Sequence, residues 1–338
     1  MNEGSYEAVG VSIERGERVM NLMRSAVEAT HGPEVLGGDG GFAGLYALRG
    51  YEEPVLASTI DGVGTKVLVA KEIGRYSSLG ADIVNHCAND VLATGARPLL
   101  FLDYVASGRL DPDAVAEVVR GAAEACRELG IALVGGETAE MPGLYAEGDF
   151  DVVGVCVGAC ERSEVVTGER VRIGDAILGL PSSGLHTNGY TLARNVVEGA
   201  GLSYSDVPKG LDRPVGEVYL EPHRAYVREI QALKKAVEVR GMAHVTGGGL
   251  PGNLPRALNG LGARLYASSW EEPAVFTLIR ALGNVPEDEM RRVFNLGVGF
   301  CVVVPEGEVD LALQALHDAG CRSWRIGEVV EGGGVEFA

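Results

Sequence analysis

The residue types best suited to chemistry gather in the stretch Thr59–Lys66, TIDGVGTK. It holds a carboxylate (Asp61), two glycines (Gly62 and Gly64), a hydroxyl (Thr65) and an ammonium group (Lys66). Carboxylates bind Mg²⁺, glycine lets a backbone approach a phosphate closely, and lysine binds phosphate oxygens. The order of residues departs from the P-loop pattern G-x-x-x-x-G-K-[ST], because the threonine precedes the lysine. Taken alone, the stretch fits a tight Asp-Gly turn with a solvated lysine equally well.

A second stretch of this kind is Leu79–Ala93, LGADIVNHCANDVLA. On a helix, Asp82, His86 and Asp90 are spaced at i, i+4 and i+8 and therefore share one face with Asn89. Such charges usually mark a solvated face, but the other positions here are mostly apolar, so we expect the helix to be covered on both sides. A buried carboxylate needs a partner, and a metal cation is a good one.

Three loops add further polar groups. The strand-like stretch before Gly135-Gly136 leads directly to Glu137, as at the active-site edge of many α/β proteins. The segment Ser182–Tyr190, SSGLHTNGY, offers caps and free amides before a helix, which is either an anion site or a simple capped loop. The glycine-rich run Leu36–Gly44 reads equally well as a flexible phosphate cover and as a linker.

Length and composition limit the classes of protein. A chain of 338 residues favours two domains, and the polar stretch near residues 163–170 divides it into 1–165 and 166–338. No apolar run is long enough for a membrane span, and the N-terminus does not resemble a signal peptide. Six scattered cysteines without a C-x-x-C pair indicate reduced thiols and a cytoplasmic location. The net charge of −18 disfavours nucleic acid as a partner but allows a small anionic substrate.

The order of apolar stretches predicts an α/β fold with layered sheets and helices. In the first half we expect a strand pair formed by residues 42–48 and 54–60, and further strands near 97–106, 131–134 and 151–159. In the second half we expect a strand over 175–180, a helix over 190–198 and one continuous helix over 214–233. The run Gly247–Gly252 fits G-x-G-x-x-G after a strand, with Glu271 about twenty residues later. Pro251 inside the turn and the short following helix argue against a dinucleotide site.

Together these segments resemble the aminoimidazole ribonucleotide synthetase family of purine biosynthesis, also called phosphoribosylformylglycinamidine cyclo-ligases. The matching segments run in order from Pro33 to Phe300 and include TIDGVGTK, NHCANDVLATGARPLLFLDY, LVGGETAEMPG, SSGLHTNGY, HVTGGGLPGNLPRAL and FNLGVGF. The resemblance therefore covers nearly the whole chain. One departure is Arg24, where family members often carry a lysine that reaches ATP.

The resemblance implies ATP-dependent cyclisation of formylglycinamidine ribonucleotide to aminoimidazole ribonucleotide, with release of ADP and phosphate. It implies a two-domain ATP-binding synthetase scaffold in which the N-terminal domains of a homodimer share a barrel, and in which a mixed C-terminal sheet carries flanking helices. ATP and Mg²⁺ are the implied cofactors. The implied metal ligands are Asp61, Asp90 and Glu137; Asp82 is their neighbour and Lys66 the phosphate clamp. The wider nucleotide site includes Gly40, Gly41, Gly62, Gly64 and Thr65, and the catalytic candidates are Lys66, His186 and Asn188.

Other families share this scaffold. Selenophosphate synthetase needs an early reactive cysteine, whereas the first cysteine here is Cys87, and the hydrogenase-maturation relative ends in a cysteine, whereas this chain ends in Ala338. A thiamine-phosphate kinase is harder to exclude, because it also uses ATP and an acidic Mg²⁺ site. A nucleotide-binding module without catalysis is the remaining alternative, and it would need no substrate loop.

Overall fold

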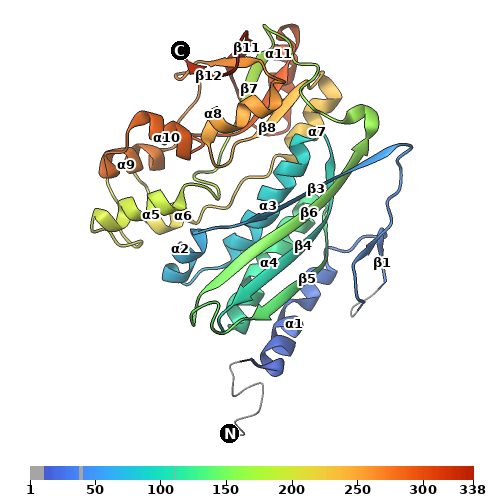
Figure 1. The fold of residues 1–338 in the computed structure, drawn as a ribbon, viewed down its shortest axis with the longest axis vertical. Helices are drawn as coiled ribbons and strands as arrows, with labels where there is room; N and C mark the ends of the chain where they lie inside the picture. The colour runs from blue at the N-terminus through green and yellow to red at the C-terminus, as the bar shows by residue number, and fades with distance from the viewer. Residues whose placement is uncertain (1–10, 38–40, 110) are drawn as a thin grey trace.

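The structure, a computed structural model, describes residues 11–37, 41–109 and 111–338 and consists of two α/β units (Figure 1). The N-terminal sheet has the order β3-β6-β4-β5. Strand β6 is antiparallel to β3 and β4, whereas β4 and β5 are parallel. The four strands are β3 (Pro54–Gly62), β4 (Arg97–Ser107), β5 (Ala132–Glu140) and β6 (Phe150–Glu161).

Helices cover one face of this sheet. Helices α3 (Ser77–Ala93) and α4 (Pro112–Leu129) pack on it and on each other, while α1 (Ile13–Glu28) packs on α4 and β5. Helix α4 begins cleanly because the Asp111 carboxylate accepts hydrogen bonds from two backbone amides of the first turn. Glycine allows the close approach of α3 and α4: a Cβ atom on Gly80 would lie 1.9 Å from the carbonyl oxygen of Val118. Helix α2 (Lys66–Ile73) directly follows β3.

The opposite face of the N-terminal sheet has no helix over it in Figure 1. It carries apolar side chains, including Leu56 (64% exposed) and Ile60 (67% exposed) on the edge strand β3. Isolated exposed apolar residues are common, but these two lie on the same face of one edge strand.

The C-terminal unit is a six-stranded sheet of order β12-β9-β11-β7-β10-β8. All neighbouring strands are antiparallel except β12 and β9. The strands are β7 (Ala176–Pro181), β8 (Gly241–His244), β9 (Gly262–Leu265), β10 (Val298–Val304), β11 (Trp324–Val330) and β12 (Gly334–Phe337). The helices are α5 (Tyr190–Gly199), α6 (Val215–Tyr219), α7 (Val227–Ala236), α8 (Gly249–Asn253), α9 (Ala274–Gly283), α10 (Glu287–Val293) and α11 (Val309–Asp318).

The predicted α/β class with mixed sheets is confirmed, and one cluster of buried apolar side chains continues through both units. Among the described residues, no helix combines the length and apolar character that a membrane crossing would require.

Two local predictions are wrong. The short strand β2 (Leu45–Tyr46) pairs with β1 (Val35–Leu36) and not with β3. The single helix expected over 214–233 is broken into α6 and α7 by the extended segment around Pro222, which cannot continue a helix. The argument against a dinucleotide site at the glycine run is confirmed: the run after β8 leads into a helix of only five residues, and β8 pairs antiparallel with β10, so no parallel βαβ unit forms there.

Asp103 on β4 predicts an unusual pH dependence of stability. It lies between Gly154 and Gly136 of the neighbouring strands, and burial raises its pKa to about 7. The folded chain therefore holds this proton more tightly than the unfolded chain from about pH 4 to about pH 7, so stability falls as the pH rises through that window. We expect Asp103→Asn to stabilise the protein at pH 8 by about 1–3 kcal/mol and to have little effect at about pH 4, as measured by urea unfolding. Equal effects at both pH values would contradict this explanation.

Candidate active site

Two carboxylates flank His86 where the two units join. Asp61 lies at the end of β3 and Asp90 on α3, and both side chains are partly exposed. The Asp61 carboxylate accepts a hydrogen bond from the Gly62 amide (2.7 Å), and the Asp90 carboxylate accepts one from the Thr59 hydroxyl (3.2 Å). Between them lies His86, whose Nε2 is 2.8 Å from Asp61 Oδ2 and 3.9 Å from Asp90 Oδ2.

A buried cluster of histidines stands behind these carboxylates. His86 Nδ1 contacts the Thr187 hydroxyl at 2.6 Å, and that hydroxyl lies 3.3 Å from His223 Nδ1. His223 Nε2 is 2.9 Å from His244 Nε2, and His244 Nδ1 is 2.9 Å from Asp90 Oδ1. The cluster joins α3, the β7–α5 loop, the α6–α7 connection and the end of β8, which are far apart in the sequence.

The carboxylates and the buried imidazoles of the site differ in charge state. Burial alone would raise the pKa of Asp61, but its contacts with His86 and the Gly62 amide lower it overall. Burial would likewise raise the pKa of Asp90, and His244 lowers it. Burial lowers the pKa of His186, His223 and His244, so these imidazoles are neutral at neutral pH. The site thus presents two anionic carboxylates supported by neutral imidazoles.

Lys66 and Asp82 form a buried ion pair instead of facing the open part of the site. Both side chains are fully buried, and Lys66 Nζ lies 2.8 Å from Asp82. Its remaining N–H groups donate to the carbonyl oxygens of His186 (3.2 Å) and Glu221 (2.8 Å). All three donors of the ammonium group are therefore used within the protein. This placement does not fit the phosphate clamp expected for Lys66 or a ligand contact for Asp82; the pair fastens the N-terminal unit to the C-terminal one.

The two candidates of the SSGLHTNGY segment lie in different surroundings. His186 is buried, adopts a positive φ of 64°, and stacks on His223 with 3.9 Å between the ring centroids. Its Nε2 accepts a hydrogen bond from the Ser183 amide (3.1 Å). Asn188 is only half-buried, next to the glycine run after β8. Of the two, Asn188 is the better placed to meet a ligand.

The structure does not bring Glu137 to the other acids within one chain. Strand pairing aligns Asp61 with Gly154, Gly154 with Asp103, and Asp103 with Gly136. Glu137 is one residue further along, so its side chain points to the other face of the sheet, three strands away from Asp61. A shared cation site with Asp61 and Asp90 in the same chain is thereby excluded.

The remaining predicted nucleotide-site residues surround the turn after β3. Gly62 and Gly64 belong to this turn, and Gly64 has a positive φ of 60° that favours glycine. The Thr65 hydroxyl lies 3.2 Å from the Thr191 hydroxyl of α5. Gly41 is exposed, and Gly40 lies outside the described residues. Arg24 is on α1, which packs at the β5 edge of the sheet, opposite β3.

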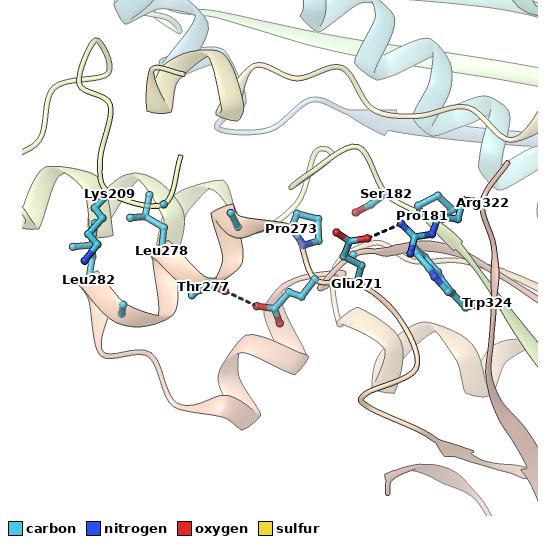
Figure 2. Close-up of a pocket in the computed structure, with 15 residues that line it drawn as sticks. Pro181, Ser182, Lys209, Glu271, Pro273, Thr277, Leu278, Leu282, Arg322 and Trp324 are labelled. Carbon is cyan, nitrogen blue, oxygen red and sulfur yellow. Dashed lines mark hydrogen bonds and ion pairs between the residues drawn. The ribbon is translucent and has the colours of Figure 1, made fainter. Parts of the chain in front are cut away.

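A separate cavity of about 750 Å³ opens in the C-terminal unit (Figure 2). Its walls include Pro273 and Leu278 of the α9 region and Trp324 of β11, and Figure 2 shows Glu271 paired with Arg322 beside Ser182. None of the site residues predicted from the sequence lines this cavity. Ser182 lines this cavity and is also the first residue of the SSGLHTNGY segment, so the cavity and the candidate site are adjacent along the chain.

Sequence reasoning missed His223 and His244 as members of the site. His244 ends a strand, and three glycines follow after Val245 and Thr246, a position that could have singled it out. His223 gave no such signal, because it lies in the middle of the stretch predicted as one helix.

Comparisons with known proteins agree with this architecture. Residues 40–160 match the AIR synthase related protein, N-terminal domain, and residues 172–338 match the AIR synthase related protein, C-terminal domain. The chain is 51% identical over 336 residues to the phosphoribosylformylglycinamidine cyclo-ligase of Gloeobacter violaceus, covering 98% of this chain and 99% of that protein. It is also 51% identical to the enzyme of the same name from Sorangium cellulosum, covering 98% and 97% of the two chains.

Solved structures show the same fold at low identity. A thiamine-monophosphate kinase from Stenotrophomonas maltophilia superposes with a TM-score of 0.71 and 18% identity, covering 95% of both chains. A hydrogenase maturation protein in complex with ATP has a TM-score of 0.67 and 20% identity, covering 96% of this chain and 89% of its own. The fold is thus shared among several activities, whereas identity near one half over the whole length is specific. On this evidence from sequence, the chain belongs to the phosphoribosylformylglycinamidine cyclo-ligase family, with its AIR synthase related N- and C-terminal domains.

Proposed function

We propose that this protein catalyses the ATP-dependent cyclisation of formylglycinamidine ribonucleotide to aminoimidazole ribonucleotide, releasing ADP and phosphate. The family membership over 98% of the chain carries this proposal. The site geometry supports it, because two partly exposed carboxylates lie at the junction of the units, beside the SSGLHTNGY segment.

The proposed reaction does not require a covalent intermediate with the protein. The amide oxygen of the substrate attacks the γ-phosphorus of ATP and displaces ADP, giving an iminophosphate. The ring-closing amine then attacks the carbon that carries the phosphorylated oxygen and expels phosphate. Phosphoryl transfer of this kind needs positioning and charge neutralisation. Asp61 and Asp90 are hard oxygen donors with open sides, so they fit Mg²⁺, which when bound would neutralise charge developing on the phosphates.

The other residues of the site position these groups in our proposal. The Gly62–Gly64 turn lets the backbone approach the nucleotide, and Asn188 is half-exposed where it can hydrogen-bond the amidine. Lys66, Asp82 and His186 are buried, so in our proposal they support the loops of the site without touching the ligand. We also place the enzyme in the cytoplasm, because all six cysteines are unpaired and buried, as suits a reducing compartment.

The decisive assay follows ATP breakdown with formylglycinamidine ribonucleotide present or absent. We expect phosphate release only with this substrate, and formation of the aminoimidazole product. Turnover with thiamine phosphate instead would favour the kinase activity named for the structural neighbour. ATP binding with no turnover on either compound would favour a nucleotide-binding module.

We further propose a homodimer that covers the helix-free face of the N-terminal sheet. Leu56 and Ile60 are largely exposed on this face, and Glu137 lies on it as well, so Glu137 could join a cation site only in a partner chain. We expect Ile60→Lys to shift the protein from dimer to monomer in sedimentation velocity at micromolar concentration, because an ammonium group is costly to bury in an apolar interface. Ile173→Lys is the matched control, since Ile173 is similarly exposed (60%) but lies outside this sheet. A wild-type monomer would contradict the proposal.

A further inference from the structure

The cavity of about 750 Å³ lies at the end of the C-terminal sheet that also carries the histidine cluster. Its wall includes Pro181 at the end of β7, Trp324 at the start of β11 and Gly297 directly before β10. His244 ends β8, and only β10 separates β8 from β7 in the sheet. Because neighbouring strands lie about 4.8 Å apart, the ends of β7 and β8 are about 10 Å from each other. The cavity and the candidate active site are therefore neighbours in space.

One wall of this cavity is apolar. Ala274, Leu278, Ala281 and Leu282 follow a helical spacing along one face of α9, and all four line the cavity, as does Trp324. Small-molecule sites typically have volumes of about 300–1,000 Å³ and mostly apolar walls with a few polar groups. The size and the wall of this cavity therefore fit a small organic ligand whose middle part packs against α9.

Lys209 is the charged group of the cavity wall that no opposite charge compensates. Glu271 pairs with Arg322 at 2.8 Å, and Glu272 accepts two hydrogen bonds of 2.9 Å from Arg280. Within residues 11–37, 41–109 and 111–338, the Lys209 ammonium group has neither an ion pair nor a hydrogen bond. The cavity thus offers an unpaired positive charge in a chain whose net charge is −18. An anionic group of a ligand is the natural partner of this ammonium group.

The unpaired lysine and the candidate active site lie toward opposite ends of the cavity. Figure 2 shows Lys209 at one end of the lining and Ser182 at the other. Gly210, next to Lys209, has a φ of 105° and also lines the cavity, so the backbone there can approach an anion closely. Ser182 Oγ is buried and has no hydrogen-bond partner among the described residues. The next residue, Ser183, donates its amide to His186 of the histidine cluster at 3.1 Å.

We propose that this cavity binds the ribonucleotide substrate, with its phosphate at Lys209 and its reacting amide at the Ser182 end. This inference rests on the proposed function for the identity of the ligand. The phosphate then meets the unpaired ammonium group, the ribose packs against the apolar face of α9, and the amide points toward the SSGLHTNGY segment. Lys209 is thereby a substrate-binding residue that takes no part in holding ATP.

Binding of ribose 5-phosphate to the full-length protein tests this site without any turnover. Tryptophan fluorescence reports on the binding, because Trp324 lines the cavity. We expect ribose 5-phosphate to bind at least about tenfold more tightly than ribose, and Lys209→Ala to lose about tenfold in affinity, because a hydrogen bond to a charged group is removed. Lys235→Ala is the matched control, since Lys235 is an exposed lysine of α7 outside the cavity. Trp324→Phe should remove the fluorescence change.

Steady-state kinetics then connects the site to the substrate. Lys209→Ala should raise the KM for formylglycinamidine ribonucleotide about tenfold and leave kcat and the KM for ATP as in the parent. Parental KM values in this variant, or a change in the KM for ATP alone, would overturn the inference and leave the proposed function standing. Equal affinities for ribose and ribose 5-phosphate would also overturn it. A parent protein that binds ribose 5-phosphate but does not turn over formylglycinamidine ribonucleotide would instead reject the proposed function, and with it the ligand named for this cavity.

Discussion

Asp90→Asn is expected to reduce metal-dependent ATP turnover by two or more orders of magnitude while the protein stays folded. Thr59 contacts Oδ2 of Asp90 and His244 contacts Oδ1. The change keeps the size of the side chain; the amide oxygen can still accept a hydrogen bond from His244, and the amide NH₂ can donate one to the Thr59 hydroxyl. It removes one of the two negative charges that attract the cation. The cation neutralises charge that develops during phosphoryl transfer, so losing the cation should lower the turnover rate more than the stability of the fold. Steady-state phosphate release with a titration of the divalent cation measures the effect.

The control for this experiment is Asp318→Asn on α11, an exposed carboxylate that accepts a hydrogen bond from Gln314 one turn earlier and lies 3.6 Å from His317. It should turn over ATP as the parent does. Circular dichroism and urea unfolding establish that both variants are folded. Parental turnover in Asp90→Asn would show that Asp90 is only a helix-face charge, and the cation site would have to be placed elsewhere.

Regular patterns within one element were predictable from the sequence. The spacing of Asp82, His86 and Asp90 predicted a covered helix with one polar face, and this is confirmed: the three side chains contact Lys66, Asp61 and His244 in turn. The reason is that the helical period is local and needs no knowledge of the partners. The family segments likewise predicted the mixed α/β fold, because they span nearly the whole chain.

Features that depend on register and long-range contacts were not predictable. The face on which Glu137 lies depends on the alignment of β4 with β5, which shifts at an irregularity between Phe101 and Leu102. A shift of one residue reverses every later side chain, and no local signal in the sequence reports it. His223 reaches the site because the chain is extended between α6 and α7, where its amide donates to the buried Asp82 carboxylate at 2.7 Å. That contact joins residues 141 positions apart.

The role of Lys66 was not predictable from the sequence either. A glycine turn followed by a lysine has the same sequence pattern whether the ammonium group binds a phosphate or a buried carboxylate. The two roles make different predictions. If the structural role is right, Lys66→Met leaves the Asp82 carboxylate buried without its cation and should destabilise the protein by about 3–5 kcal/mol in urea unfolding. Asp82→Asn should also destabilise it, because Lys66 then keeps a buried charge.

The double variant Lys66→Met/Asp82→Asn separates these roles most sharply. Burial raises the pKa of Asp82 and lowers that of Lys66, so each charge is tolerated only because the other is present. Removing both charges together should therefore cost clearly less than the sum of the single changes, with a coupling of about 1–3 kcal/mol. The matched control is the exposed pair of Lys71 and Asp149, where Lys71 lies on the same helix as Lys66 and the coupling should stay below about 1 kcal/mol. If Lys66 were a phosphate clamp, the Lys66→Met protein would be as stable as the parent but would bind ATP more weakly. Adding Asp82→Asn would then not restore ATP affinity.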